Sequence, residues 1–232
     1  MKHKPSAVAQ DYLKVIWSIR EWDAGEPVTT SLLAARLAVS PSTASEAVKR
    51  LVERGLVRHD PYSSIELTAE GERLALAMVR RHRLLESFLV GRLGFGWDEA
   101  HDDAEILEHA ASDRFIAAID QLLGHPRRDP HGDPIPTDEG VIAHPAAQSL
   151  AVTPAPASAV VERISDADPA MLRYFASVGL VPDAAITLVE RRDFAGVLSI
   201  RIEATGATVE LGDIAAEAVW VSPPAPHMPP TD

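Results

Sequence analysis

Two histidines and two glutamates recur at helical spacing near the middle of the chain. His101 is followed by Glu105, Glu108 and His109, which stand four, seven and eight residues further along, so an α-helix would present all four on one face. Carboxylates this close repel one another unless a cation neutralises them. Imidazole and carboxylate donors without thiolate suit Mn²⁺, Fe²⁺, Co²⁺ or Zn²⁺. The spacing therefore favours metal binding over a solvated acidic face with chance histidines.

A second pair of possible ligands precedes this group. His82 and Glu86 are one helical turn apart, in the same row as the apolar residues Met78, Leu85 and Leu89. If the two helices pack against each other, up to six nitrogen and oxygen donors would converge. We find no His-Glu-x-x-His pattern and no obvious nucleophile, so a zinc hydrolase is the weaker interpretation.

A third group of residues is suited to reading DNA. Ser40 can cap a helix over 41–54, and Pro41 suits its first position. In a helix-turn-helix, the N-terminal residues of the second helix enter the major groove, and short hydroxyl side chains can contact phosphates or base edges. The alternative is a plain helical bundle with a solvated hydroxyl face. The DNA-contact candidates are Ser40, Pro41, Ser42, Thr43, Ser45, Glu46, Lys49 and Arg50, with Arg58 on a following hairpin.

The elements that must position these groups follow from hydrophobic periodicity. Apolar residues recur at helical spacing through most of the first 123 residues, and period-two alternation begins at Ala159. Seven prolines between residues 124 and 158 indicate a linker. The expected fold is mainly α with small β parts. Its elements are helices over 6–22, 31–38, 41–54, 69–92, 98–111, 113–123 and 169–178, a hairpin over 56–68, and short strands of a β-barrel-like domain after residue 159.

Composition and charge narrow the class of protein further. The chain of 232 residues has no cysteine, which excludes disulfides and thiolate metal sites. Its net charge is −12, yet residues 1–60 hold nine Lys and Arg against seven Asp and Glu. No apolar run approaches the roughly 20 residues that span a membrane, and no signal peptide is evident. We expect a cytoplasmic protein without a membrane partner or an organic cofactor.

The order of these parts resembles the diphtheria-toxin-repressor family of metal-dependent regulators, in particular its manganese transport regulator branch. The resemblance covers nearly all of residues 6–222. It rests on Asp11-Tyr12-Leu13, the segment 40–56, the run 81–86, the run 101–109 and the run 131–136. It implies a winged helix-turn-helix over 1–68, a helical dimerisation and metal domain over 69–140, a linker over 141–158, an SH3-like domain over 159–222 and a disordered tail over 223–232.

The resemblance also implies two metal sites. The primary ligands would be Asp11, Glu105, Glu108 and His109. The ancillary ligands would be His82, Glu86 and His101, with Asp129, His131 and either Asp166 or Asp168 as additional ligands. The iron-sensing branch has Met and Cys where this chain has Asp11 and Glu105, and carboxylates favour a harder ion, Mn²⁺. Relatives with a two-metal cluster carry a carboxylate where this chain has Lys14, so that cluster cannot simply be transferred.

The expected function is manganese-dependent repression of transcription by a homodimer bound to double-stranded operator DNA. An iron-dependent regulator using Fe²⁺ is the alternative within the family. A metal-binding hydrolase or a metal chaperone is the alternative from another class. A hydrolase would need turnover at an open coordination position, and a chaperone would bind metal without binding DNA.

Overall fold

The computed structural model describes residues 5–22, 27–60 and 63–223. The predicted tail therefore lies outside the described residues, apart from Pro223. The chain divides into two compact units. We refer to residues 1–82, 108–111 and 136–141 as the first unit, and to 83–107, 112–135 and 142–232 as the second unit.

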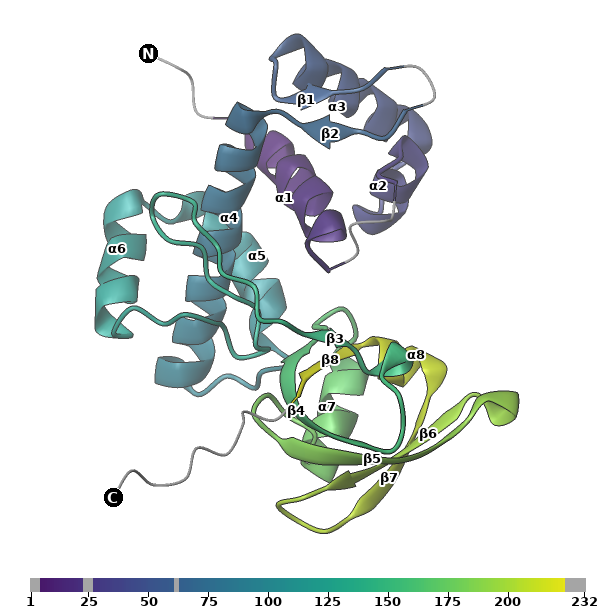
Figure 1. The fold of residues 1–232 in the computed structure, drawn as a ribbon. Coiled ribbons are helices and arrows are strands. Elements are labelled where there is room, and N and C mark those ends of the chain that lie inside the picture. Colours follow the sequence, from purple (N-terminus) through teal and green to yellow (C-terminus); the bar gives the residue numbers. More distant parts are fainter. Residues whose placement is uncertain (1–4, 23–26, 61–62, 224–232) are drawn as a thin grey trace, which may run out of the picture. The chain divides into compact units, whose positions relative to one another are not determined.

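The N-terminal part of the first unit is three helices and a hairpin (Figure 1). Thr29 and Ser40 each accept a hydrogen bond from a backbone N–H in the first turn of the following helix, which fixes where α2 and α3 begin. Buried Leu13, Ile16 and Leu33 lie in its core. The elements are α1 (Ala7–Trp22), α2 (Thr30–Arg36), α3 (Pro41–Glu53), and β1 (Val57–Arg58) paired with β2 (Glu66–Leu67).

Three further helices follow, and the first two of them, α4 and α5, carry most of the candidate ligands. α4 spans Ala69–Phe88 and continues as a π-helical turn over Leu89–Leu93. Gly94 then ends it with a φ of +78°, a conformation that glycine adopts without strain. α5 spans Ala100–Ala110 and α6 spans Asp113–Leu122. The predicted helices therefore exist, with ends that differ by a few residues.

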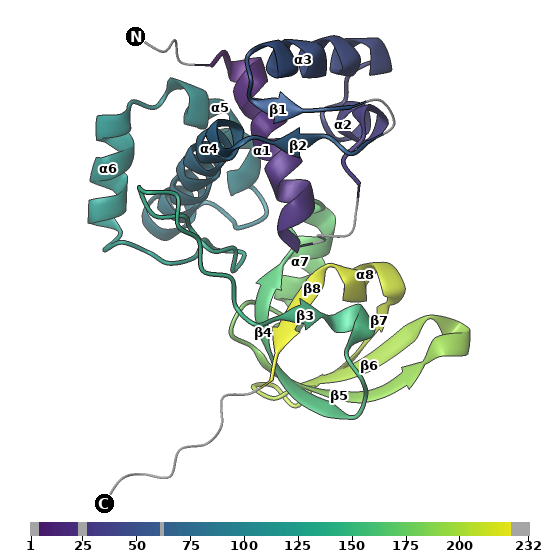
Figure 2. The same ribbon diagram turned by 45° about the horizontal axis from the view of Figure 1, so that its top comes forward.

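A six-stranded antiparallel sheet with order β3-β8-β4-β5-β6-β7 forms the C-terminal part of the second unit (Figure 2). Alternate residues of its strands point inward and pack around Phe175 of α7. We call residues 148–222 the sheet domain. Its elements are β3 (Gln148–Ser149), β4 (Ala157–Ile164), α7 (Pro169–Val178), β5 (Ala185–Arg192), β6 (Val197–Ile202), β7 (Thr208–Gly212), α8 (Asp213–Glu217) and β8 (Val219–Ser222).

The predicted fold class is confirmed, but two details differ from the sequence prediction. The sheet begins at Gln148, inside the predicted linker, because β3 pairs with β8. A strand of two residues beside prolines leaves no alternation to detect. The five-residue α8 was not predicted either, since it is too short to show helical periodicity. Among the described residues, no helix is long and apolar enough to cross a membrane.

Candidate metal centres and DNA-reading helix

The first cluster of possible ligands joins α1 to the end of α5. Asp11, Glu108 and His109 each offer a ligand atom within 4.8 Å of the others. Nε2 of His109 lies 2.8 Å from Oδ1 of Asp11 and 3.7 Å from Oε1 of Glu108. Glu108 is fully buried, whereas the side chains of Asp11 and His109 are 30% and 22% exposed. The site is therefore open on one side and closed on the other.

Both oxygens of Glu108 already have charged or polar partners. Nζ of Lys14 donates to Oε1 at 2.7 Å, and Nδ1 of His82 lies 2.7 Å from Oε2. Burial, the largest single effect, raises the pKa of Glu108, but His82 and Lys14 together outweigh it and hold that pKa below its ordinary value. Glu108 therefore stays ionised and ready to bind a cation.

Gln10 fixes the tautomer of His109. Its amide oxygen lies 2.9 Å from Nδ1 of His109, so Nδ1 is the nitrogen that carries the proton. The lone pair is then on Nε2, the atom that faces Asp11. A neighbour that accepts from the outer nitrogen of a histidine is the usual partner of a metal-binding imidazole.

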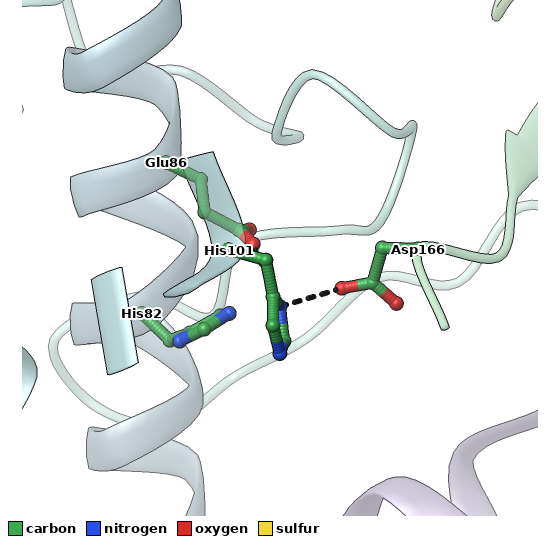
Figure 3. Close-up of side chains that lie close together, drawn as sticks. All are labelled: His82, Glu86, His101 and Asp166. Atoms are coloured by element: carbon green, nitrogen blue, oxygen red, sulfur yellow. Dashed lines mark hydrogen bonds and ion pairs between the residues drawn. The ribbon is translucent and has the colours of Figure 1, made fainter. Parts of the chain in front are cut away.

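The second cluster lies in the second unit, where a residue of the sheet domain meets two helices (Figure 3). Nδ1 of His101 is 3.1 Å from Oδ2 of Asp166 and 3.3 Å from Oε1 of Glu86. Hydrogen bonds to Asp166 and then Glu86 raise the pKa of His101 to about 10. Burial raises the pKa of Asp166, but the contacts with His101 and other cationic groups lower it overall. Without a metal, the proton on His101 therefore balances part of the negative charge of these carboxylates.

A loop after α6 adds Asp129 and His131 to this cluster. Both, with Glu86, offer ligand atoms within 4.8 Å of one another, and all three are buried. Nε2 of His131 donates to the carbonyl oxygen of Trp97 at 2.7 Å, and the two rings stack. Nδ1 of His131 is buried and has no hydrogen-bond partner among the described residues, and it lies 3.9 Å from Oε2 of Glu86.

The charges in this loop also require a cation. Burial, followed by the charges of Asp133 and Glu86, raises the pKa of Asp129 well above its ordinary value. Burial also lowers the pKa of His131, but Asp129 and Glu86 outweigh it and raise that pKa overall. An unpartnered buried imidazole nitrogen beside under-compensated carboxylates fits a divalent metal ion.

Three predicted ligands have contacts outside the metal site that the sequence predicted for them. His82 precedes Glu86 by one turn on α4 and contacts Glu108 in the first unit. Glu105 belongs to the second unit, where its Oε1 lies 3.7 Å from Nε2 of His101, so its place in the primary site stays a prediction. Asp168 caps α7 by accepting from two backbone N–H groups, and Asp166 is the residue beside His101.

The predicted DNA-contact residues are all exposed to solvent. Ala44, Val48 and Leu51 face inward on α3, which leaves the hydroxyl and charged residues of this helix in solvent. Arg50 pairs with Glu46 at 3.2 Å, and Arg58 pairs with Glu66 across the hairpin at 3.4 Å. Exposed pairs of this kind contribute little stability, so phosphates can compete for both arginines. The exposed set is Ser40, Pro41, Ser42, Thr43, Ser45, Glu46, Lys49, Arg50 and Arg58.

Comparison with protein families gives three consecutive matches. Residues 4–65 match the N-terminal DNA-binding domain of iron-dependent repressors. Residues 68–137 match the metal-binding and dimerisation domain of the same family. Residues 149–223 match the FeoA domain.

Individual proteins give the same result. The chain is 32% identical over 189 residues to the iron-dependent repressor IdeR of Mycobacterium tuberculosis strain H37Rv, covering 76% of this chain and 81% of the relative. It is 31% identical to the diphtheria toxin repressor of Corynebacterium diphtheriae, covering 87% and 83%. A solved structure of a manganese-dependent transcriptional repressor in complex with manganese is 55% identical, with a TM-score of 0.87 over 92% of this chain and 99% of that one.

Proposed function

Because the chain belongs to the iron-dependent repressor family, a family of metal-dependent DNA-binding regulators, we propose that it is a manganese-activated transcriptional repressor. It binds operator DNA in the cytoplasm as a homodimer. The observation that carries this proposal is the first cluster, where Asp11 of the DNA-reading segment meets Glu108 and His109 of the dimerisation segment.

The donor atoms support manganese. The two clusters contain only carboxylate oxygens and imidazole nitrogens, and the chain has no cysteine. Donor sets rich in oxygen suit a hard ion such as Mn²⁺. The structure at 55% identity is described as a manganese-dependent repressor bound to manganese. Since Mn²⁺ is the weakest binder in the Irving–Williams order, selection must come from geometry and ion supply and not from raw affinity.

In the mechanism that we propose, metal binding fixes the position of the recognition helix, α3. A bound ion would supply positive charge that holds Asp11, Glu108 and His109 together. Gln10 orients His109, and Lys14 with His82 keeps Glu108 ionised. In this way α1 is fixed against Glu108 and His109, and the two recognition helices of a dimer acquire the separation that the operator requires.

Exposed apolar side chains support the homodimer. Ile106 is 73% exposed, Leu122 is 56% exposed, and Phe115 and Leu93 are also exposed. All four lie in α5, α6 or the turn after α4, within the segment that matches the dimerisation domain. Large apolar side chains exposed to solvent within one such segment are consistent with a protein–protein interface. We also propose the domain division 1–68, 69–140 and a C-terminal SH3-like domain, whose start at residue 148 is earlier than the sequence suggested.

An iron-responsive regulator is the second candidate. The relatives at 31–32% identity are named as an iron-dependent repressor and the diphtheria toxin repressor. An operator duplex selected from a random DNA pool should be titrated with the protein in chelator, in Mn²⁺ and in anaerobic Fe²⁺. Strong binding in Mn²⁺ alone supports the manganese proposal, and equal binding in chelator would contradict the metal switch.

The same titration tests the reading helix. Thr43→Ala and Ser45→Ala should weaken specific binding by about 1–3 kcal/mol for each base contact that they remove. Both side chains are exposed, so Mn²⁺ affinity and dimerisation should be unchanged. If both variants bind the operator as the wild type does, the proposed placement of α3 in the groove is wrong.

A further inference from the structure

A buried chain of alternating charges lies beside the second cluster. Nε of Arg163, on β4 of the sheet domain, donates to Oδ1 of Asp133 at 2.6 Å. The same oxygen lies 3.4 Å from a guanidinium nitrogen of Arg83, on α4. Arg83 in turn lies 3.8 Å from Oδ2 of Asp129, one of the proposed ligands. These charge contacts therefore connect the sheet domain, the loop 129–134 and α4.

Each member of this chain is less than 9% exposed, so none is an ordinary surface charge. Buried charges are tolerated only when their hydrogen-bonding capacity is filled. Arg83 also donates to the carbonyl oxygen of Pro134 at 2.6 Å, and the guanidinium of Arg163 lies 4.4 Å above the ring of Trp220. Both arginines are thus held in place from several sides.

The loop that carries the ligands depends on β4 for its shape. The N–H of Ile164 donates to the carbonyl oxygen of His131 at 2.9 Å. Gly132 has a φ of +94°, and a Cβ there would collide with the carbonyl oxygen of Glu162, so only glycine permits this approach. Oδ1 of Asp129 accepts from the N–H groups of His131 and Asp133, both at 2.9 Å. A displacement of β4 would therefore move His131 directly.

The charges also account for the valence of the ion. Four buried or partly buried carboxylates meet here, from Glu86, Asp129, Asp133 and Asp166. Arg83 and Arg163 keep their charge at any physiological pH, and they compensate two of the four. When the neighbouring histidines are neutral, two negative charges are left, which is the complement of one divalent cation.

We propose that Arg163, Asp133 and Arg83 form a charge bridge that positions Asp129 and His131 for the metal and fastens the sheet domain to the loop. This inference rests on the proposed second metal site. The three are positioning residues, because they act through Asp129 and the loop and do not ligate the ion. Attachment of β4 and metal binding are then coupled, and each strengthens the other.

The test compares Arg163→Met, which removes the charge and keeps much of the volume, with Arg163→Lys, which keeps the charge but not the planar fork. Arg128→Ala is the matched control. Arg128 lies in the same region and pairs with Asp183 of the sheet domain at 2.6 Å, but both side chains are well exposed, 42% and 67%. Mn²⁺ binding to the full chain is followed by calorimetry and by the electron paramagnetic resonance of free Mn²⁺. Limited proteolysis in chelator reports how firmly the sheet domain is attached.

We expect two Mn²⁺ sites in the wild type. Arg163→Met should weaken the second site about 10- to 100-fold, the range for residues that orient ligands, and leave the first unchanged. The Mn²⁺ affinity of the second site in Arg163→Lys should lie between those of Arg163→Met and the wild type, and that of Arg128→Ala should equal the wild-type value. The sheet domain of Arg163→Met should be cleaved faster in chelator. A merely structural role would instead weaken both metal sites together.

The outcomes separate the two proposals. Two sites of wild-type affinity in Arg163→Met would overturn the bridge and leave the metal site standing. A wild type that binds one ion would overturn the second metal site and the bridge with it. If Arg163→Met does not fold, Asp133→Asn keeps the shape while breaking the bridge. Unchanged second-site affinity in that variant would overturn the proposal.

Discussion

The two clusters of possible metal ligands differ most in how their negative charge is balanced. In the first cluster, the ammonium of Lys14 and the imidazole of His82 take the two oxygens of the buried Glu108. In the second, Glu86 and Asp129 are buried, and the raised pKa values of Asp129 and His101 show that protons supply part of the balance. A permanent cation therefore lies directly on the buried carboxylate of the first cluster, whereas Arg83 and Arg163 compensate only part of the negative charge of the second.

This difference indicates distinct tasks for the two sites. A cluster that is balanced without metal can stay assembled while an ion enters and leaves, and its partly exposed Asp11 and His109 give access. That behaviour suits the reversible switch. A buried cluster that needs either protons or a metal suits a site whose filling stabilises the structure around it.

The largest expected difference between the two clusters is in operator affinity, and it follows from a change at Asp11. It is the ligand that α1 contributes to the first cluster, so Asp11→Ala removes the proposed link to the recognition helix. We expect operator affinity in Mn²⁺ to fall about 1,000-fold, or about 4 kcal/mol. Glu86→Gln in the second cluster should cost no more than about tenfold. Fluorescence anisotropy with a labelled operator measures both.

Equal losses in the two variants would contradict this division of tasks. Dimerisation, measured by sedimentation, is the control, because neither side chain lies among the exposed apolar residues of α5 and α6. A loss of dimerisation in Asp11→Ala would mean that the effect on DNA binding is indirect.

Lys14→Met removes the ammonium group that compensates Glu108 in the first cluster. Breaking one side of a buried pair costs about 3 kcal/mol, because the remaining charge loses its partner. The free energy of unfolding in chelator should therefore fall by about that amount. Mn²⁺ should restore more stability to this variant than to the wild type, since the ion can take over the neutralisation of Glu108. Urea unfolding with and without Mn²⁺ measures both.

Lys49→Met is the matched control, because Lys49 is exposed on α3. Its stability should stay within about 0.5 kcal/mol of the wild type. If Lys14→Met unfolds like this control in chelator, Lys14 does not compensate Glu108, and the contrast between the two clusters is wrong.

The fold was largely predictable because its elements are long or strictly alternating. Helices with a clear apolar stripe and capping residues such as Ser40 gave correct positions within a few residues. The prediction failed for β3 and α8, which are too short to show a period and are held by pairing or packing with residues distant in the sequence.

The ligand types were predictable from local spacing, but the residues that contact and orient the ligands were not. His101, Glu108 and His109 form a visible pattern on one helix, whereas Gln10, Lys14 and Arg163 reach the clusters from distant segments. The sequence shows that Lys14 follows Asp11 by three residues on the same helix, yet not that its ammonium meets Glu108. Nothing local marks Arg163 as a partner of Asp133, because that contact exists only once the sheet domain has folded.

The smallest expected effect concerns protons at the second cluster. The metal-free His101 has a pKa of about 10, so it is protonated at pH 7.5, and a metal can bind only its neutral form. Filling this site should release about one proton from His101, and this step should raise the affinity about tenfold per pH unit as the pH approaches that pKa. Calorimetry in buffers of different ionisation enthalpy counts the protons. Mn²⁺ binding at the first cluster should release fewer protons, since the pKa of Glu108 is already lowered.

The same raised pKa affects the metal-free fold in the opposite direction. A histidine whose folded pKa lies above its ordinary value of about 6.5 stabilises the fold fully below that value, and the stabilisation is lost as pH rises through about 10. Rising pH should therefore destabilise the protein in chelator while it strengthens metal binding at the second cluster. His101→Gln removes the titrating group and should abolish both trends. If this variant still releases the same number of protons on Mn²⁺ binding, the protons come from elsewhere, and His101 is not the group that balances the charge of Glu86 and Asp166 in the absence of metal.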